Sequence, residues 1–313
     1  MVYVGIDVGG TGLKAGVVDE NGKMLSKVSC PTGVERGYGP VIKDMANMAL
    51  KALEESGVPM EEVHSIGIGI PGILDPRTGI VPFCTNLGWH RVPLIEEMHK
   101  YIDKPILVDN DATVAALAES VAGACAGVKN SVFLTLGTGV GGGIVIDGKV
   151  YSGPHGVASE LGHMIVVVDG EECTCGNHGC WERYASATAL IRLGHEAVKR
   201  HPDSVMAARG DELNAKDVTD AARAGDPAAV EAFDRYTYYL AVGMVNIINF
   251  FDPEIIAVGG GVSGAGEFLL QPVREKLKKL IFYKDMPHAR IELARLSNDA
   301  GIIGAAMLGA QEA

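Results

Sequence analysis

Apolar residues follow two different spacings along the chain. Apolar runs with strand character occupy 2–19 (two strands around a glycine turn), 63–70, 106–108, 132–136, 144–146, 255–258 and 291–294. Apolar residues three and four positions apart predict helices over 40–56, 112–122, 185–200, 217–224, 227–250, 266–281 and 299–311. Strands that alternate with helices predict an α/β protein.

One supersecondary pattern occurs twice. A glycine turn joins the two strands of 2–19, and another joins 132–136 to 144–146; hairpin signals, Asp19-Glu20-Asn21-Gly22 and Asp147-Gly148, follow each pair. This repetition indicates two related domains that face each other. We expect a small first domain of residues 1–112 plus 299–313, and a larger second domain of residues 113–298 that carries the cysteine cluster.

Composition narrows the class of protein. The chain has 313 residues, of which 47% are hydrophobic and 21% charged, so it can bury a sizeable core. Its net charge of −12 argues against broad binding to nucleic acid or to an anionic membrane surface. No run of eighteen apolar residues predicts a membrane span, and the first residues resemble a strand and not a signal peptide. We therefore expect a cytoplasmic protein.

The first glycine turn, Asp7-Val8-Gly9-Gly10-Thr11-Gly12-Leu13-Lys14, has the composition of a phosphate-binding loop. Gly9 and Gly10 allow backbone N–H groups to approach a polyphosphate, and Thr11 adds a hydroxyl donor. Asp7 ends the strand, where it can hold the hydrated Mg²⁺ that bridges phosphates. The alternative is a tight glycine hairpin with Asp7 as a capping residue.

The second turn, Gly137-Thr138-Gly139-Val140-Gly141-Gly142, fits the G-x-G-x-x-G dinucleotide pattern. That pattern needs a helix directly after the glycines, whereas 144–146 is a strand. We therefore reject a dehydrogenase. Gly137, Thr138 and Gly139 are instead predicted to form a second phosphate-binding turn.

Asp109-Asn110-Asp111 lies where a strand gives way to a helix, the position at which ligands bind in open α/β sheets. A carboxylate here can take the proton of an acceptor hydroxyl during phosphoryl transfer. Capping of the helix is the ordinary role of such residues and remains the alternative.

Three of the six cysteines, Cys173, Cys175 and Cys180, lie within eight residues, whereas Cys30, Cys84 and Cys125 are scattered. Cys₃His is a closed zinc set, and the acidic surroundings favour a structural site over a nucleic-acid finger. His163 and His178 both qualify as the fourth ligand; the spacing does not decide between them. Three free thiols are the alternative.

These motifs together resemble the ROK family of bacterial sugar kinases and repressors, on the actin-like ATPase (ribonuclease H-like) fold with an active-site cleft between two domains. The resemblance rests on the turn at Asp7, Gly67-Ile68-Gly69-Ile70-Pro71-Gly72, Asn110-Asp111-Ala112, the turn at Gly137, Glu160-Leu161-Gly162-His163, the cysteines with Glu182, and Gly259-Gly260-Gly261-Val262-Ser263. Many relatives carry glycine where this chain has Ser159, so a local adjustment is expected there.

The resemblance also implies roles for single residues. Asp111 would be the catalytic base for a sugar 6-hydroxyl, and Asn86, Asn110, Glu160, His163 and Glu182 would bind the sugar. His163 would also ligate zinc with the three cysteines. The ATP contacts would come from both glycine turns, Lys14 and the glycines Gly259, Gly260 and Gly261.

The implied function is transfer of a phosphoryl group from ATP to a hexose. Asn86-Leu87-Gly88-Trp89 and Glu160-Leu161-Gly162-His163-Met164 most resemble glucokinases. The expected cofactors are ATP with catalytic Mg²⁺ and structural Zn²⁺, and the expected partners are a sugar and a second copy of the chain. Kinases for N-acetylmannosamine, N-acetylglucosamine, fructose or allose remain alternatives, as does a non-catalytic sugar-sensing regulator.

Overall fold

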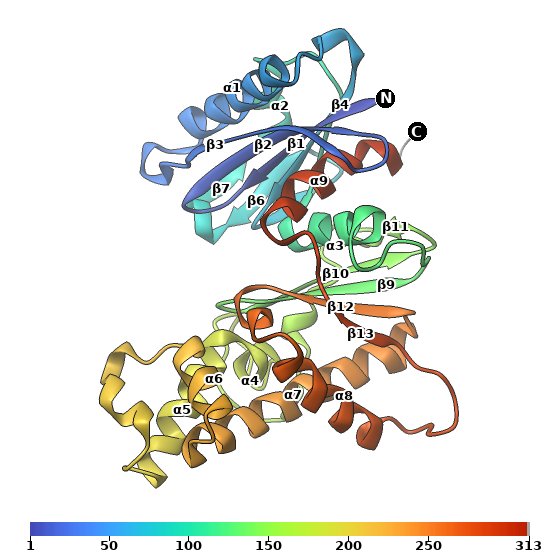
Figure 1. Cartoon of the computed structure of the whole chain (residues 1–313). Helices are drawn as coiled ribbons and strands as arrows, with labels where there is room; N and C mark the ends of the chain where they lie inside the picture. The colour runs from blue at the N-terminus through green and yellow to red at the C-terminus, as the bar shows by residue number, and fades with distance from the viewer. Residues whose placement is uncertain (312–313) are drawn as a thin grey trace. The chain divides into compact units, whose positions relative to one another are not determined.

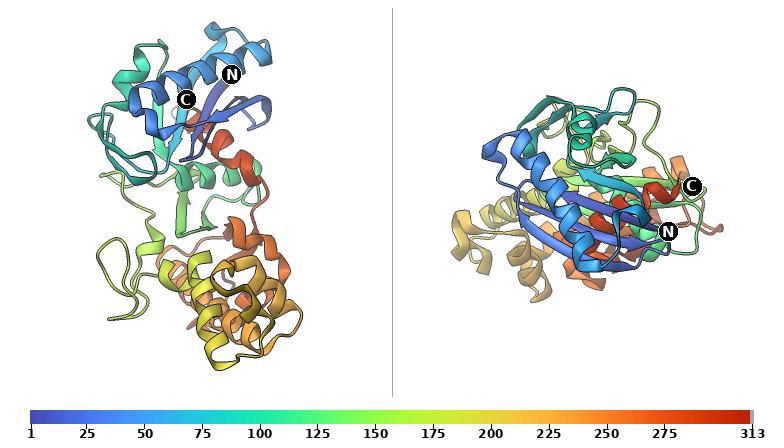
Figure 2. Two further views of the ribbon diagram at one scale, coloured as in Figure 1. Left: turned by 90° about the vertical axis from the view of Figure 1, so that its left-hand side faces the viewer. Right: turned by 90° about the horizontal axis from the view of Figure 1, so that it is seen from above.

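The computed structural model describes residues 1–311, which group by contacts into two compact units (Figures 1 and 2). Unit 1 comprises Met1–Phe133, Gly143–Ser159 and the residues from Ala294 onward, and unit 2 comprises Leu134–Gly142 and Glu160–Leu293. These units are bounded differently from the predicted domains, because the helix after Asp111 packs on the final helix of the chain and so groups with unit 1. The domain assignment itself stays a prediction.

Unit 1 is built on a five-stranded sheet with the order β3-β2-β1-β4-β8. Its strands are β1 (Val2–Val8), β2 (Gly12–Asp19), β3 (Met24–Pro31), β4 (Val63–Ile70) and β8 (Ile106–Asn110). The first three pair antiparallel, whereas β1, β4 and β8 are parallel, so β1, β4 and β8 have their carboxyl ends at one edge. Asp7 lies near the carboxyl end of β1, and Asp111 directly follows β8. Both residues predicted to take part in the chemistry are therefore at this edge.

Helices cover both faces of this sheet (Figure 1). One apolar core lies between the sheet and α1 (Tyr38–Ser56), and a second lies between the sheet, α3 (Asp111–Ala122) and α9 (Ala300–Met307). Gly57 ends α1 in the left-handed conformation that glycine tolerates. The helix predicted over 299–311 is shorter than expected: a 3₁₀ turn, Gly309–Gln311, follows α9.

The contact of α9 with its neighbours is backbone against backbone at three glycines. A Cβ placed on Gly5 would lie 1.9 Å from the Ile302 carbonyl oxygen, and one on Gly67 would lie 1.7 Å from that of Ala305. A Cβ on Gly304 would lie 1.6 Å from the Val114 oxygen of α3. Larger residues cannot occupy these positions without moving α9.

Unit 1 also holds a small antiparallel sheet that the sequence did not predict, β5 (Ile73–Asp75), β6 (Ile80–Cys84) and β7 (Trp89–Val92), followed by α2 (Leu94–His99).

The second large sheet has the order β11-β10-β9-β12-β13. Its strands are β9 (Ser131–Leu136), β10 (Val140–Ile146), β11 (Lys149–Val150), β12 (Ile255–Gly259) and β13 (Arg290–Leu293). The chain passes from one unit to the other within β9 and within β10.

The helices of unit 2 are α4 (Glu182–Ala185), α5 (Ala187–Arg200), α6 (Ala215–Arg223), α7 (Pro227–Phe251) and α8 (Glu267–Leu280). The helix predicted over 185–200 is divided at Ser186, whose hydroxyl caps α5 by accepting the Ala189 N–H. Further 3₁₀ turns occupy Val34–Arg36, Met60–Glu62, Thr85–Leu87, Leu161–His163, Val205–Glu212, Gly261–Ala265 and Ser297–Asp299. Within the described 1–311, no helix combines the length and apolarity that a membrane crossing needs.

Candidate active site

The first glycine turn lies between β1 and β2 in unit 1 and is held by backbone contacts. The Gly9 N–H donates to the Gly12 carbonyl at 2.9 Å, and the Thr32 hydroxyl donates to the Gly9 carbonyl at 2.6 Å. Asp7 is opposite Lys14 in the strand pair, and its Oδ2 lies 3.0 Å from the lysine Nζ. The turn therefore presents one ion pair, with both side chains partly buried, beside exposed Thr11.

The Asn110-Asp111 pair lies at the start of α3, where the helix macrodipole favours negative charge. Asn110 is the N-cap: its Oδ1 accepts the Ala112 N–H at 2.9 Å, and its Nδ2 donates to the Gly72 carbonyl at 3.3 Å. Asp111 also accepts the Ala112 N–H, at 2.8 Å, and is exposed. Capping thus falls mainly to Asn110, and the Asp111 carboxylate stays accessible to a substrate.

Asn86 reaches the same part of unit 1 from the 3₁₀ turn Thr85–Leu87. A Cβ on Gly10 would lie 3.1 Å from the Asn86 carbonyl oxygen, so this turn touches the phosphate turn. Buried Cys84 precedes it; burial raises the pKa of its thiol, and the charge of Asp111 adds to the effect. Asn86, Asp111 and Gly10, which are far apart in sequence, are therefore neighbours.

The Asp109 carboxylate is held by two hydrogen bonds within unit 1. Its carboxylate accepts the Ser152 hydroxyl at 2.6 Å and the Asn110 N–H at 2.7 Å. Burial raises its pKa, and these two hydrogen bonds only partly oppose the shift. Asp109 therefore supports the junction of β8 and α3, where Asn110 and Asp111 lie.

In unit 2 the three cysteines meet His163. The ligand atoms of His163, Cys173, Cys175 and Cys180 all lie within 4.8 Å of one another. Cys175 Sγ is 3.6 Å from Cys180 Sγ, and Cys173 Sγ is 3.8 Å from His163 Nδ1. Tetrahedral zinc with bonds of about 2.3 Å to sulfur separates its ligands by about 3.8 Å, so the donor set fits zinc. Across residues 1–311, His178 joins no such group.

The pKa values of the thiols in this cluster are shifted in opposite directions. The Asn177 N–H lowers the pKa of Cys175 to about 7, whereas burial raises that of Cys180 to about 12. Desolvation also raises the pKa of Cys173. Three thiolates this close together need a cation to hold them, since a coordinating metal deprotonates its thiols.

The residues predicted to bind sugar in unit 2 surround this cluster. His163 turns Nδ1 toward Cys173 and Nε2 toward Glu160, whose Oε2 is 4.0 Å away. Glu182 Oε1 is 3.2 Å from Cys173 Sγ. A Cβ on Gly139 would lie 2.5 Å from Glu182 Oε2, so the second glycine turn touches this carboxylate.

Ser159, where the resemblance led us to expect glycine, has φ 72°, in the left-handed region that favours glycine. Its hydroxyl donates to the Tyr151 carbonyl at 3.1 Å. The serine thus keeps the glycine-like backbone ahead of Glu160 and adds one hydrogen bond.

A pocket of about 720 Å³ in unit 2 is lined by three of the predicted nucleotide-binding residues; the others do not line it. Its lining includes Gly137, Thr138 and Gly261, and the start of α5 fixes this turn because the Ala187 N–H donates to the Gly137 carbonyl at 2.8 Å. Gly260 has φ 83°, and a Cβ there would lie 2.5 Å from the Leu136 backbone. The turn at Gly137 and the segment Gly259-Gly260-Gly261 are therefore neighbours at this pocket.

Helix α6, which was not predicted to carry site residues, also lines this pocket. Lys216, Asp220 and Arg223 line the pocket from this helix. The Arg223 guanidinium lies 5.0 Å from the centre of the Phe268 ring and donates to the Ala265 carbonyl at 3.1 Å. The sequence predicted a helix over 217–224, but no local motif marks its charged residues as site residues.

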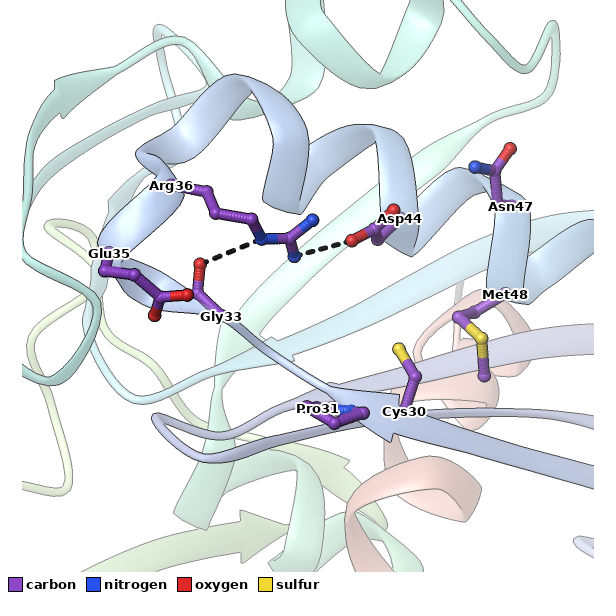
Figure 3. A pocket seen from close by; sticks show the side chains of 8 residues that line it. All are labelled: Cys30, Pro31, Gly33, Glu35, Arg36, Asp44, Asn47 and Met48. Atoms are coloured by element: carbon purple, nitrogen blue, oxygen red, sulfur yellow. Dashed lines mark hydrogen bonds and ion pairs between the residues drawn. The ribbon is translucent and has the colours of Figure 1, made fainter.

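A second recess, of about 470 Å³, lies in unit 1 between β3 and α1 (Figure 3). Arg36 crosses it, donating to the Gly33 carbonyl at 3.2 Å and to Asp44 Oδ2 at 2.6 Å. Cys30 and Met48 form part of its wall. The cation is already paired within the recess, and none of the predicted site residues lines it.

Comparison with known proteins gives one consistent result. The model of the ROK family matches residues 3–312. The glucokinase of Thermotoga maritima is 40% identical over 97% of this chain and 96% of its own, and that of Halalkalibacterium halodurans is 38% identical over 99% and 95%. A crystal structure of a ROK family glucokinase from Streptomyces griseus, in complex with glucose and AMPPNP, is 37% identical, with a TM-score of 0.81 over 99% of this chain and 100% of its own. The predicted fold class is confirmed by this similarity.

Proposed function

This chain belongs to the ROK family, and we propose that it is an ATP-dependent glucokinase that phosphorylates the 6-hydroxyl of glucose. The observation that carries the proposal is the end-to-end match to glucokinases, one of them crystallised with glucose and an ATP analogue. Each unit of the present structure also contains the groups that such a reaction requires.

Unit 1 would supply the base. Transfer of a phosphoryl group to a hydroxyl needs a positioned acceptor and a carboxylate that accepts its proton. Asp111 is exposed at the start of α3, next to Asn110, whose side chain is fixed by its two hydrogen bonds. In this proposal Asp111 takes the proton of the 6-hydroxyl, and Asn86 and Asn110 hold neighbouring hydroxyls.

ATP would bind through the first and second glycine turns and through Gly259, Gly260 and Gly261. The 720 Å³ pocket is large enough for a nucleoside, and Gly137 and Gly261 are among its lining residues. When bound, Mg²⁺ would neutralise charge on the phosphates, with Asp7 as its protein-side carboxylate. Lys14 would hold Asp7 and face the same phosphates.

Zinc would brace the sugar-binding residues of unit 2. With Nδ1 on the metal, the His163 proton must be on Nε2, the nitrogen that faces Glu160. Nε2–H can then donate to a sugar hydroxyl, while Glu160 and Glu182 accept from others. The metal supplies charge and orientation only, and we assign it no step in the transfer.

We also propose that the protein is cytoplasmic and self-associates through unit 2. Phe250, Phe282 and Met286 are 78%, 80% and 67% exposed there, which is unusual for large apolar side chains. Sedimentation of the purified protein would test this part.

The test of function is a coupled ADP assay with glucose, N-acetylmannosamine, N-acetylglucosamine, fructose and allose. Asp111→Asn should lower kcat with glucose by about 10²- to 10⁴-fold and change the glucose dissociation constant by less than about threefold. Asp103→Asn, an exposed aspartate with no assigned role, is the control. Near-normal kcat in Asp111→Asn would remove Asp111 as the base. Glucose binding without ADP formation would support the sensor alternative.

A further inference from the structure

The Asp7 carboxylate is enclosed from two sides in unit 1. Lys14 Nζ approaches Oδ2 to 3.0 Å from the neighbouring strand. On another side lies Gly301, in the first turn of α9: a Cβ there would lie 2.5 Å from Asp7 Cγ and 2.8 Å from each carboxylate oxygen. The carboxylate thus occupies the space that a side chain at position 301 would need.

The first turn of α9 cannot move away to make that space. The close contacts at Gly5, Gly67 and Gly304 seat the helix directly on β1, β4 and α3. Carbonyl oxygens within 2 Å of a hypothetical Cβ leave no slack for a shift of the helix. A methyl group on Gly301 would therefore displace Asp7 and not α9.

The same arrangement fixes the position of the Asp7 side chain. The Lys14 ammonium attracts the carboxylate from one side, and the first turn of α9 contacts it at Gly301. Because Asp7 directly precedes the glycine turn, a shift of its carboxylate by about 1 Å changes its position relative to any phosphate held by that turn.

We propose that Gly301 is a positioning residue for the phosphate end of ATP. Because Gly301 has no side chain, the Asp7 carboxylate can occupy the position from which it would reach the magnesium-bound phosphates. The inference rests on the proposed function in assigning Asp7 to that metal. It adds a residue that touches neither substrate and that no motif in the sequence marks.

The experiment compares Gly301→Ala with Gly39→Ala in the full-length protein. Gly39 lies in the first turn of α1, also in unit 1, and a Cβ there meets nothing within 4 Å. We expect Gly301→Ala to weaken AMPPNP binding about tenfold or more in Mg²⁺ buffer and to leave it unchanged in EDTA. Its KM for glucose should stay within about twofold, and Gly39→Ala should match the wild type.

A second variant separates positioning from packing. In the Asp7→Ala background the clash is gone, so Gly301→Ala should change neither the melting temperature nor AMPPNP binding further. Should Gly301→Ala alone fold poorly, the double variant should recover the loss. Equal losses of stability in both backgrounds, or equal weakening with and without Mg²⁺, would overturn the inference.

The outcome for the wild type separates this inference from the proposed function. Wild-type turnover together with a normal Gly301→Ala overturns the inference alone. Magnesium-dependent AMPPNP binding without phosphorylation of any sugar overturns the glucokinase assignment, and the comparison of dissociation constants still decides the role of Gly301. A wild type that binds no nucleotide overturns both.

Discussion

Replacing Glu119 by glutamine should destabilise the protein strongly. Glu119 is fully buried near the end of α3. Its carboxylate accepts the backbone N–H of Ala124 at 2.6 Å, of Arg295 at 2.9 and 3.1 Å, and of Leu296 at 2.8 Å. The side chain thereby ties α3 to the segment that leads into α9.

The magnitude follows from these hydrogen bonds. In Glu119→Gln one oxygen becomes an NH₂ group, which faces an N–H donor and leaves that donor buried without an acceptor. Each charge-assisted bond contributes about 1.5–3 kcal/mol, and an orphaned buried donor costs about 1–3 kcal/mol. Because the remaining oxygen keeps part of the network, we expect a net loss of about 3 kcal/mol. At about 2–4 °C per kcal/mol the melting temperature falls by roughly 6–12 °C.

The assay is thermal unfolding by calorimetry together with amide hydrogen exchange. Glu55→Gln, an exposed glutamate of α1, is the matched control and should shift stability by no more than about 0.5 kcal/mol. The amides of Arg295 and Leu296 should exchange faster in Glu119→Gln than in the control. A melting temperature equal to that of the control would refute the conclusion that this carboxylate holds the three N–H groups.

Three further variants test the cysteine cluster, the buried Asp109 and the pocket of unit 2. Cys180→Ser should lower bound zinc from about one ion per chain to near zero by elemental analysis, and unchanged metal content would remove Cys180 as a ligand. Burial raises the pKa of Asp109, so the folded chain holds the carboxyl proton of Asp109 more tightly than the unfolded chain does. Ionisation of Asp109 therefore lowers the free energy of unfolding. Asp109→Asn should therefore melt higher than the wild type at pH 7, and this advantage should shrink as the pH falls to about 4; an advantage that does not change with pH would contradict the argument. Arg223→Ala removes a cation from the pocket lining and the donor to the Ala265 carbonyl, so the KM for ATP should rise about tenfold while that for glucose does not. Equal changes in both KM values would show that Arg223 does not act at the ATP pocket.

Much of the fold could be predicted because it depends on local spacing. The strand 63–70 and the helices 40–56, 217–224 and 227–250 agree with the structure to within two residues at each end. Their apolar residues repeat over several turns or form one continuous run, and a glycine or a capping side chain marks at least one end of each of these helices.

The small sheet β5-β6-β7 was missed for the opposite reason. Its strands are three to five residues long, and Pro76, Gly79 and Pro82 interrupt any alternation. Its pairing depends on contacts between short segments, and propensity alone does not predict such contacts. Asn86 lies within this region, so its position beside Gly10 could be found only in three dimensions.

The site residues also divide into those that a local sequence motif marks and those that depend on contacts between distant segments. The glycine turns and cysteines are short sequence motifs, and spacing suffices to notice them. The choice of His163 over His178 as the cysteines' neighbour depends on how the 3₁₀ turn Leu161–His163 packs against the cysteine segment, and spacing left it open. Arg223, Glu119 and Gly301 have no motif, because each acts through a residue far away in the chain.

The position of α9 in the chain has a consequence for synthesis. The sheet of unit 1 is complete once β8 has emerged from the ribosome, but the helix that covers the faces of Gly5 and Gly67 is made only after the whole of unit 2. At about 5–20 residues per second, α9 follows α3 by roughly ten to forty seconds. During that interval an apolar face stays open on the nascent chain. A stop codon just before Ala300 should therefore yield aggregated protein that chaperones retain, and not a shortened enzyme.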